Sequence, residues 1–448
     1  MSYSSTGPKP YERASKSSHH HVINDEAVVA ALKSLQVPPK ADTGEVTKRL
    51  IPFMPVKTSI LHVVAVDGGY TEVPVREGFP AAAIHFFQFG ALHFKIEDLV
   101  KLEAQQHVAP EDIQKLKNID RLKLPLATSG ARRRDCGSLR ESVRKTLHDF
   151  LAAQKLGEDI SLLDTLAWFV FRRYKSQREA DDKQWVLSSH PDGKSDGPIE
   201  LAEANMSAGF TFICPKSGQT IFLSDVFRLH ERVEEETGAA GVAGYVAGLV
   251  EHLVLLHIIR NLLRKNAAAL KQVLFIMDRP TGWFGVTAPM HRLMLELNNW
   301  LFDSHNLFLA GLEKSGAFVE HAAAIQELLP PANILVLDDE YIYRHISPGE
   351  ENPTRAYAAT SYYGHKVIFR SRQGQMYVVS LPVRELKKSP KPTDLPNLQA
   401  VLTHVEQLHC DMYENALLPV ALANKLVSLS AHPSSQILRA FAQSSVGK

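Results

Sequence analysis

The sequence is poor in cysteine and has no long uninterrupted apolar run. Its 448 residues include three cysteines, Cys136, Cys214 and Cys410, which are far apart and odd in number. This usage indicates neither a disulfide framework nor a cysteine zinc knuckle, and it favours a reducing compartment. The chain does not begin with an apolar stretch of signal-peptide length, and charged and histidine side chains interrupt the most apolar segment, at about 240–263. We therefore expect a soluble, cytoplasmic protein without a membrane span.

The chain also has no excess of charge of one sign. Its formal net charge is +1, and 45% of its residues are hydrophobic, which is ordinary for a globular protein. A protein of this charge that binds nucleic acid needs local basic clusters, because no overall basic field attracts the phosphates. The candidate clusters are Arg132-Arg133-Arg134, Arg172-Arg173, Arg260 with Arg264-Lys265, and Lys387-Lys388. Each of them taken alone is more often a solvated face than a phosphate contact.

The pattern of apolar runs and breakers divides the chain into four parts. Residues 1–50 form a polar N-terminal arm with a short helix at 25–36, and this arm is a candidate docking element. Residues 51–135 form the first part of a core, and residues 236–448 form the second part. We interpret residues 136–235 as an insertion, with a loop at 184–205 and a hairpin around Pro215-Lys216-Ser217-Gly218.

Apolar runs predict strands that alternate with helices in the second half of the chain. β-branched or apolar runs bounded by breakers are typical of buried strands, and longer periodic segments are typical of helices. Strands are expected at 60–67, 81–95, 272–278, 306–312, 334–337, 366–369 and 376–379. Helices are expected at 96–124, within 139–183, and at 240–263, 287–303, 316–328, 395–409 and 416–429. This order predicts an α/β fold in which helices flank a mixed sheet.

Two aspartates end the most apolar of the predicted strands. Asp67 is followed by Gly68-Gly69, whose missing side chains would let a phosphate backbone approach closely. Asp278 ends the strand that follows the long apolar helix. An ordinary turn or a helix cap remains an alternative at both positions. If the two strands are neighbours, the carboxylates repel each other unless a proton or a metal ion lies between them.

A third carboxylate lies within the apolar helix at about 240–263. The neighbours of Glu251 on its own helix face are apolar, so its side chain is expected to be buried. A buried charge needs a partner, which would be either a metal ion or a salt bridge to an arginine. Asp338 and Asp339 follow a later strand and are reserve ligands if Glu251 has another role.

Two aspartates and a glutamate are hard oxygen ligands, which suit Mg²⁺ or Mn²⁺ better than zinc. Such ions stabilise the attacking and leaving oxygens of a phosphodiester during hydrolysis. We hypothesise one ion held by Asp67 and Asp278 and a second ion shared with Glu251.

The order of these features resembles that of the NurA family of nucleases. In both, a strand leads into Asp-Gly-Gly, an apolar helix carries an embedded glutamate, and a later strand ends in aspartate. Further similarities lie in Leu312-Glu313-Lys314-Ser315, where the family usually has Lys-Ser or Lys-Thr, in Tyr362-Tyr363-Gly364 to Val379, and in Pro10 to Ser18, which resembles the start of defence-associated bacterial members. The likeness spans about 50–100 and 240–430.

The resemblance implies an RNase H-like core with a helical and hairpin insertion. It implies a homodimer that cleaves DNA with Mn²⁺ or Mg²⁺, as an endonuclease and exonuclease, and docks onto a HerA-like hexameric ATPase-translocase in DNA end processing or anti-phage defence. By position, Asp67, Glu251 and Asp278 become metal ligands, and Lys314 becomes a catalytic phosphate contact. The DNA-binding candidates are then Arg132, Arg133, Arg134, Arg260, Arg279 and Lys314.

One departure from the family lies near the C-terminus. The family commonly has a Pro-containing segment that leads to Ala-His, with the histidine near the metals, whereas this chain has Asn424. An asparagine can ligate through its amide oxygen but cannot transfer a proton near neutral pH. Either another histidine such as His409 substitutes, or the nuclease is less active. The alternatives are a catalytically weak NurA-like scaffold that regulates a HerA-type motor, another RNase H-like enzyme acting on RNA–DNA hybrids or as a transposase, and a DNA-binding module without chemistry.

Overall fold

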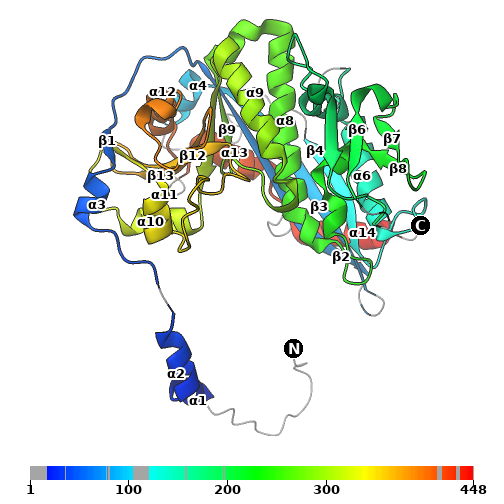
Figure 1. The fold of residues 1–448 in the computed structure, drawn as a ribbon, viewed down its shortest axis with the longest axis horizontal. Coiled ribbons are helices and arrows are strands. Elements are labelled where there is room, and N and C mark those ends of the chain that lie inside the picture. The colour runs from blue at the N-terminus through cyan, green and yellow to red at the C-terminus, as the bar shows by residue number, and fades with distance from the viewer. Residues whose placement is uncertain are drawn as a thin grey trace.

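A nine-stranded mixed sheet forms the centre of the molecule (Figure 1). The computed structural model describes residues 18–446 except 36, 77, 79–80, 104–120, 157–158, 194, 196, 411–415 and 430–433. From one edge to the other, the strands are β1 (Leu50–Pro52), β11 (Asn333–Val336), β12 (Gly364–Arg370), β13 (Met376–Pro382), β10 (Phe308–Glu313), β9 (Val273–Met277), β2 (His62–Arg76), β3 (Ala82–Lys95) and β4 (Leu122–Ser129).

Five adjacent strands have the order and orientation of an RNase H-like core. β2, β3 and β4 form an antiparallel meander, β9 lies parallel to β2 on its other side, and β10 lies parallel to β9. In chain order, the third, second, first, fourth and fifth strands therefore lie side by side, and β3 alone runs against the others. The predicted RNase H-like α/β fold is confirmed. The antiparallel strands β13, β12, β11 and β1 extend the sheet beyond β10.

Helices cover both faces of the sheet because its central strands are apolar on both sides. On β2, Val64 and Val66 join a core with α6 (Leu139–Ala153), α7 (Leu162–Val170), α8 (Ala243–Asn266) and α9 (Met290–Ser304). Val63 and Ala65 face the opposite core, with α4 (Ile96–Glu103), α12 (Leu398–Gln407) and α13 (Leu418–Val427). The remaining α-helices of the described residues are α1 (Ser18–Ile23), α2 (Glu26–Lys33), α3 (Thr43–Thr47), α10 (Ala317–Ala324), α11 (Asp339–His345) and α14 (Ser434–Ser445).

The segment Ala240–Gln272, which contains α8, is long and apolar enough to cross a membrane by length and composition alone. However, 83% of its most apolar window is buried inside the protein, where α8 packs against the sheet. A helix that is buried in this way is a core helix of a globular fold.

The prediction of one helix over 96–124 is wrong at its C-terminal end. α4 ends at Glu103, residues 104–120 lie outside the described chain, and Leu122–Ser129 form β4. Leu122, Leu124 and Leu126 are buried in alternation with exposed residues, which is the period of a strand. Pro125 is tolerated because β4 is an edge strand.

The expected loop at 184–205 contains a small two-stranded sheet, β5 (Gln184–Leu187) and β6 (Ile199–Ala202). The expected hairpin is confirmed as β7 (Thr211–Ile213) and β8 (Thr220–Phe222). Together with α6 and α7, these strands make up the segment 136–235, which shares one hydrophobic core with the large sheet.

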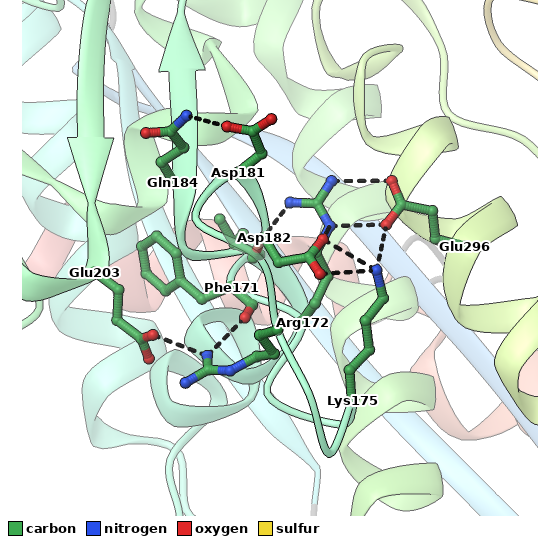
Figure 2. A network of polar contacts seen from close by, with 10 residues as sticks. Phe171, Arg172, Lys175, Asp181, Asp182, Gln184, Glu203 and Glu296 are labelled. Atoms are coloured by element: carbon green, nitrogen blue, oxygen red, sulfur yellow. Dashed lines mark hydrogen bonds and ion pairs between the residues drawn. The ribbon is translucent and has the colours of Figure 1, made fainter.

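Ion pairs also attach this segment to α9. Figure 2 shows Arg172 and Lys175 converging on Glu296. The guanidinium of Arg172 donates two hydrogen bonds to the Glu296 carboxylate, at 2.7 and 2.9 Å. Asp182 accepts a hydrogen bond from Lys175 at 3.0 Å, and the neighbouring Arg173 is paired with Glu203. The basic pair Arg172-Arg173 therefore makes structural contacts.

Candidate active site

The ends of β9 and β10 lie beside the middle of β2 and bring Asp278 and Lys314 next to Asp67. Val66 of β2 is paired with Met277 of β9, so Asp67 and Asp278 follow laterally adjacent positions. Strand spacing is about 4.8 Å, and both side chains follow the same alternation along their strands. Lys314 follows β10, and its Nζ lies 2.8 Å from Oδ2 of Asp278. The predicted end of a strand at Asp278 is confirmed, whereas the predicted end at Asp67 is wrong. β2 continues through Asp67 and Gly68-Gly69 to Arg76, because this stretch stays paired with β3.

Asp67 is buried, with 5% of its surface exposed. Its Oδ1 accepts a hydrogen bond of 2.8 Å from the backbone N–H of Gly68, whereas its Oδ2 has no hydrogen-bond partner among the described residues. Burial, together with the nearby Asp278 carboxylate, raises the pKa of Asp67 to about 6, against smaller opposing effects of Gly68, Lys314 and Asn424. A buried carboxylate oxygen without a donor, next to a second carboxylate, has the chemistry of a cation ligand.

Glu251 lies next to this pair and is bound to Arg279. Its carboxylate is 1% exposed and accepts two hydrogen bonds from the Arg279 guanidinium, one from Nε to Oε2 and one of 2.8 Å from Nη2 to Oε1. Burial raises the pKa of Glu251, Arg279 opposes this, and the charges of Asp67 and Asp278 add to the increase. The arginine salt bridge is the alternative that the sequence left open. The role of Glu251 as a metal ligand stays a prediction.

Asp67, Asp278 and Glu251 form an acidic cluster, and Arg279 binds to it through Glu251. About a fifth of the Arg279 side chain is exposed. An added Cβ at Gly248 of α8 would lie 2.6 Å from Nη1 of Arg279, so the glycine makes room for the guanidinium. Sequence reasoning missed the pairing with Glu251, because the two residues lie on different elements and share no periodic pattern. A DNA contact by Arg279 remains a prediction.

Gly68 and Gly69 allow other parts of the protein to pack closely against β2. From the sequence we expected a phosphate backbone to approach at these glycines, and the structure does not support this expectation. An added Cβ at Gly68 would lie 2.7 Å from the Phe89 ring and 2.8 Å from Oε1 of Glu251. An added Cβ at Gly69 would lie 2.6 Å from the backbone oxygen of Val427, in α13. The space beside both glycines is already filled by the protein.

The close packing of α13 brings Asn424 to the site. Gln88 of β3 donates a hydrogen bond of 2.7 Å to the backbone oxygen of Leu426 near the end of the helix. Asn424 lies two residues earlier and is near enough to Asp67 to lower its pKa. The position that the family resemblance assigns to a histidine is therefore beside the aspartates. His409 pairs through its backbone with Leu417, just before α13.

The reserve ligands and the other basic candidates have contacts elsewhere. Asp338 accepts a hydrogen bond from Arg49 at 2.7 Å and caps α11, and Asp339 accepts one from the backbone of Tyr357. The distal basic residues contact the segment around α6 and α7: Arg132 donates to the backbone of Gly137, Arg133 is paired with Asp135 and Asp149, and Arg260 donates to Thr165. Arg134 is exposed.

Comparison with known proteins gives few matches. No protein-family model matches the chain, and no curated protein matches it. The similar solved structures include the NurA nuclease from Sulfolobus solfataricus, at 10% identity, with 93% of this chain and 92% of that chain covered and a TM-score of 0.35. They also include NurA with manganese, at 11% identity, 91% and 94% coverage and a TM-score of 0.31, and a further NurA structure, at 10% identity, 96% and 95% coverage and a TM-score of 0.30. At such scores the likeness adds nothing to the fold assignment, which rests on strand order and orientation.

Proposed function

We propose that this protein is a Mn²⁺- or Mg²⁺-dependent deoxyribonuclease of the NurA type, which hydrolyses phosphodiester bonds as an endonuclease and exonuclease. The observation that carries the proposal is the pair Asp67 and Asp278 at laterally adjacent positions of β2 and β9, with Oδ2 of Asp67 buried and unpartnered among the described residues. Burial, and then repulsion by the Asp278 carboxylate, raise the pKa of Asp67, and a divalent cation would compensate the buried negative charge.

The residues at this edge fit a divalent metal centre. Asp67 and Asp278 would hold the metal, with Glu251 and the amide oxygen of Asn424 as further candidate ligands, and we propose two ions. When bound, such ions supply charge stabilisation for the oxygens of the scissile phosphodiester. Lys314, which already donates to Asp278, adds a positive charge toward the phosphate.

We further propose that DNA crosses the sheet at the carboxyl ends of β9 and β10. Basic side chains would bind its phosphates by charge, without contacts to the bases. Lys314 and Arg279 lie within the cluster, whereas Arg132, Arg133, Arg134 and Arg260 would contact the backbone farther from the reacting phosphate. These contacts carry no sequence information, which suits an enzyme that degrades DNA ends.

Cleavage of linear and circular DNA in Mn²⁺ tests the proposal. We expect Asp67→Ala to reduce cleavage to background because it removes one of the two central carboxylates. The matched control is Asp159→Ala, at an exposed aspartate of the segment between α6 and α7. Retention of wild-type cleavage by Asp67→Ala would refute the assignment. Equal activity on an RNA–DNA hybrid would favour the other RNase H-like enzymes.

The proposed partner is a HerA-like hexameric ATPase, which a cytoplasmic homodimer of this chain would dock onto in DNA end processing or anti-phage defence. The N-terminal arm is the proposed docking element, because α2 buries no residue and lies away from the rest of the fold in Figure 1. Deletion of residues 1–35, which removes α2 with the rest of the arm before it, should weaken co-purification with the hexamer and leave the fold intact. Unchanged co-purification would exclude the arm.

Two observations favour a second candidate function, a catalytically weak scaffold that regulates the motor. Asn424 cannot transfer a proton near neutral pH, and Arg279 already binds both oxygens of Glu251. On this alternative, wild type and Asp67→Ala stimulate the ATPase equally, and neither cleaves DNA. Stimulation together with cleavage that only wild type shows would exclude it.

A further inference from the structure

Two turns in the segment 136–235 bring metal-ligating side chains together, far from the acidic cluster in the sequence. His190 and Asp192 lie in the connection between β5 and β6, and Cys214 begins the turn of the β7–β8 hairpin. Sγ of Cys214 lies 3.2 Å from Nδ1 of His190. One ligand atom from each of the three residues lies within 4.8 Å of the other two.

Two of the three side chains are buried, and the third, Asp192, is partly buried. His190 and Cys214 are 2% and 3% exposed, and Nε2 of His190 has no hydrogen-bond partner among the described residues. Asp192 is oriented by Ser195, which donates from its backbone N–H at 3.0 Å and from its hydroxyl at 2.9 Å. The backbone N–H of Ser217 points at Sγ of Cys214 from 3.4 Å, a contact that stabilises a thiolate.

We propose that His190, Asp192 and Cys214 bind one zinc ion. An imidazole nitrogen, a carboxylate oxygen and a thiolate are all established zinc ligands, at about 2.0–2.3 Å from the metal. Two ligands of one tetrahedral zinc ion therefore lie about 3.5 Å apart, close to the observed separation of Sγ and Nδ1. Thiolate and imidazole select zinc over Mg²⁺ and Mn²⁺, so this site is chemically distinct from the acidic cluster.

The position of the site indicates a structural role. The β5–β6 and β7–β8 pairs are each two-stranded, and an isolated pair of this size is marginally stable. A zinc ion between His190 and Cys214 cross-links the two pairs. Asp192 also lines a cavity of about 850 Å³, with Gly193, Gly218 and Thr220, so one side of the proposed site borders an open space through which a metal ion can enter.

Metal uptake by the full-length protein tests the site independently of nuclease activity. Protein stripped with a chelator is titrated with Zn²⁺, and bound metal is counted by mass spectrometry. We expect one zinc per chain in wild type, in Cys136→Ser and in Asp67→Asn, and loss of that ion in Cys214→Ser and His190→Ala. Equal zinc in wild type and Cys214→Ser, or none in wild type, would overturn the proposal.

A second measurement does not depend on whether Cys214→Ser folds. The double variant Cys136→Ser/Cys410→Ser leaves Cys214 as the only cysteine of the chain. Titrated with Co²⁺, it should develop the charge-transfer absorption of a cobalt–thiolate bond, and Zn²⁺ should displace that absorption. Absence of the band in a folded double variant would refute a thiolate ligand at Cys214.

Discussion

At the scale of single residues, Asp67 is placed where its charge opposes folding. Its pKa in the folded protein is about 6, against an ordinary value of 3.8, because it is buried beside Asp278. A carboxyl group whose pKa is raised by folding stabilises the folded state below its ordinary pKa, and that contribution is lost as the pH rises to the folded value. Such a cost is typical of functional carboxylates, since a bound cation removes it.

The first prediction concerns Asp67→Asn in the absence of metal. Between about pH 4 and pH 6 the wild type should lose stability relative to the variant, by up to about 3 kcal/mol, and the difference should stay constant at higher pH. Thermal unfolding in EDTA measures this, with Asp159→Asn as the exposed control. A difference between wild type and Asp67→Asn that does not change from pH 4 to pH 8 would contradict the assigned pKa.

The second prediction concerns the buried pair Glu251 and Arg279. Arg279→Met leaves the 1% exposed carboxylate of Glu251 without its counter-charge and should cost about 3–5 kcal/mol of unfolding free energy. The double variant Glu251→Leu/Arg279→Met should recover most of this loss, because neither charge then remains unpaired.

Urea unfolding measures the three proteins. The exposed pair Arg384 and Asp303 provides the control, and Asp303→Asn should have a much smaller effect because solvent screens that pair. A loss for Arg279→Met no larger than that for Asp303→Asn would show that the buried pair is not coupled as described.

At the scale of elements, two glycines determine how α13 packs on the sheet. Gly69 of β2 and Gly90 of β3 face the last turn of the helix, where a side chain would collide with Val427 and Leu426. This packing holds Asn424 beside Asp67, so the geometry of the site depends on it.

The third prediction is that Gly69→Ala costs about 1–3 kcal/mol, because the added methyl group meets a backbone oxygen that cannot move without the helix. Gly244→Ala is the matched control: it lies near the start of α8 with open space around it, and it should be neutral or stabilising by up to about 1 kcal/mol. Equal effects of the two substitutions on chemical denaturation would contradict the close packing.

The elements that the sequence predicted are those with a strong local pattern. Asp67 and Asp278 end apolar runs bounded by breakers, and such runs specify buried strands without knowledge of their neighbours. β4 also has a local pattern of alternating leucines, but the charged residues before it favoured a helix over 96–124. The Glu251–Arg279 pair, the packing of α13 and the His190–Cys214 contact join distant parts of the chain, and no periodicity within either part specifies them.

At the scale of the whole molecule, the segment 136–235 is part of the central core. Its α6 and α7 pack in the same hydrophobic cluster as β2 and α8, and Arg172 joins it to α9. The helix that carries Glu251 is therefore held between the sheet and this segment. The acidic cluster is supported from both faces of the sheet, by α8 on one side and α13 on the other.

The central claim is that Asp67 and Asp278 form a divalent-metal centre, and Mn²⁺ binding tests it most directly. Calorimetric titration of the chelator-treated, zinc-reloaded protein should show Mn²⁺ binding at pH 7.5 that is lost in Asp67→Asn and in Asp278→Asn and retained in Asp159→Asn. Binding should weaken as the pH falls through about 6, where Asp67 takes up a proton. Undiminished Mn²⁺ binding in both site variants, or none in wild type, would contradict the account.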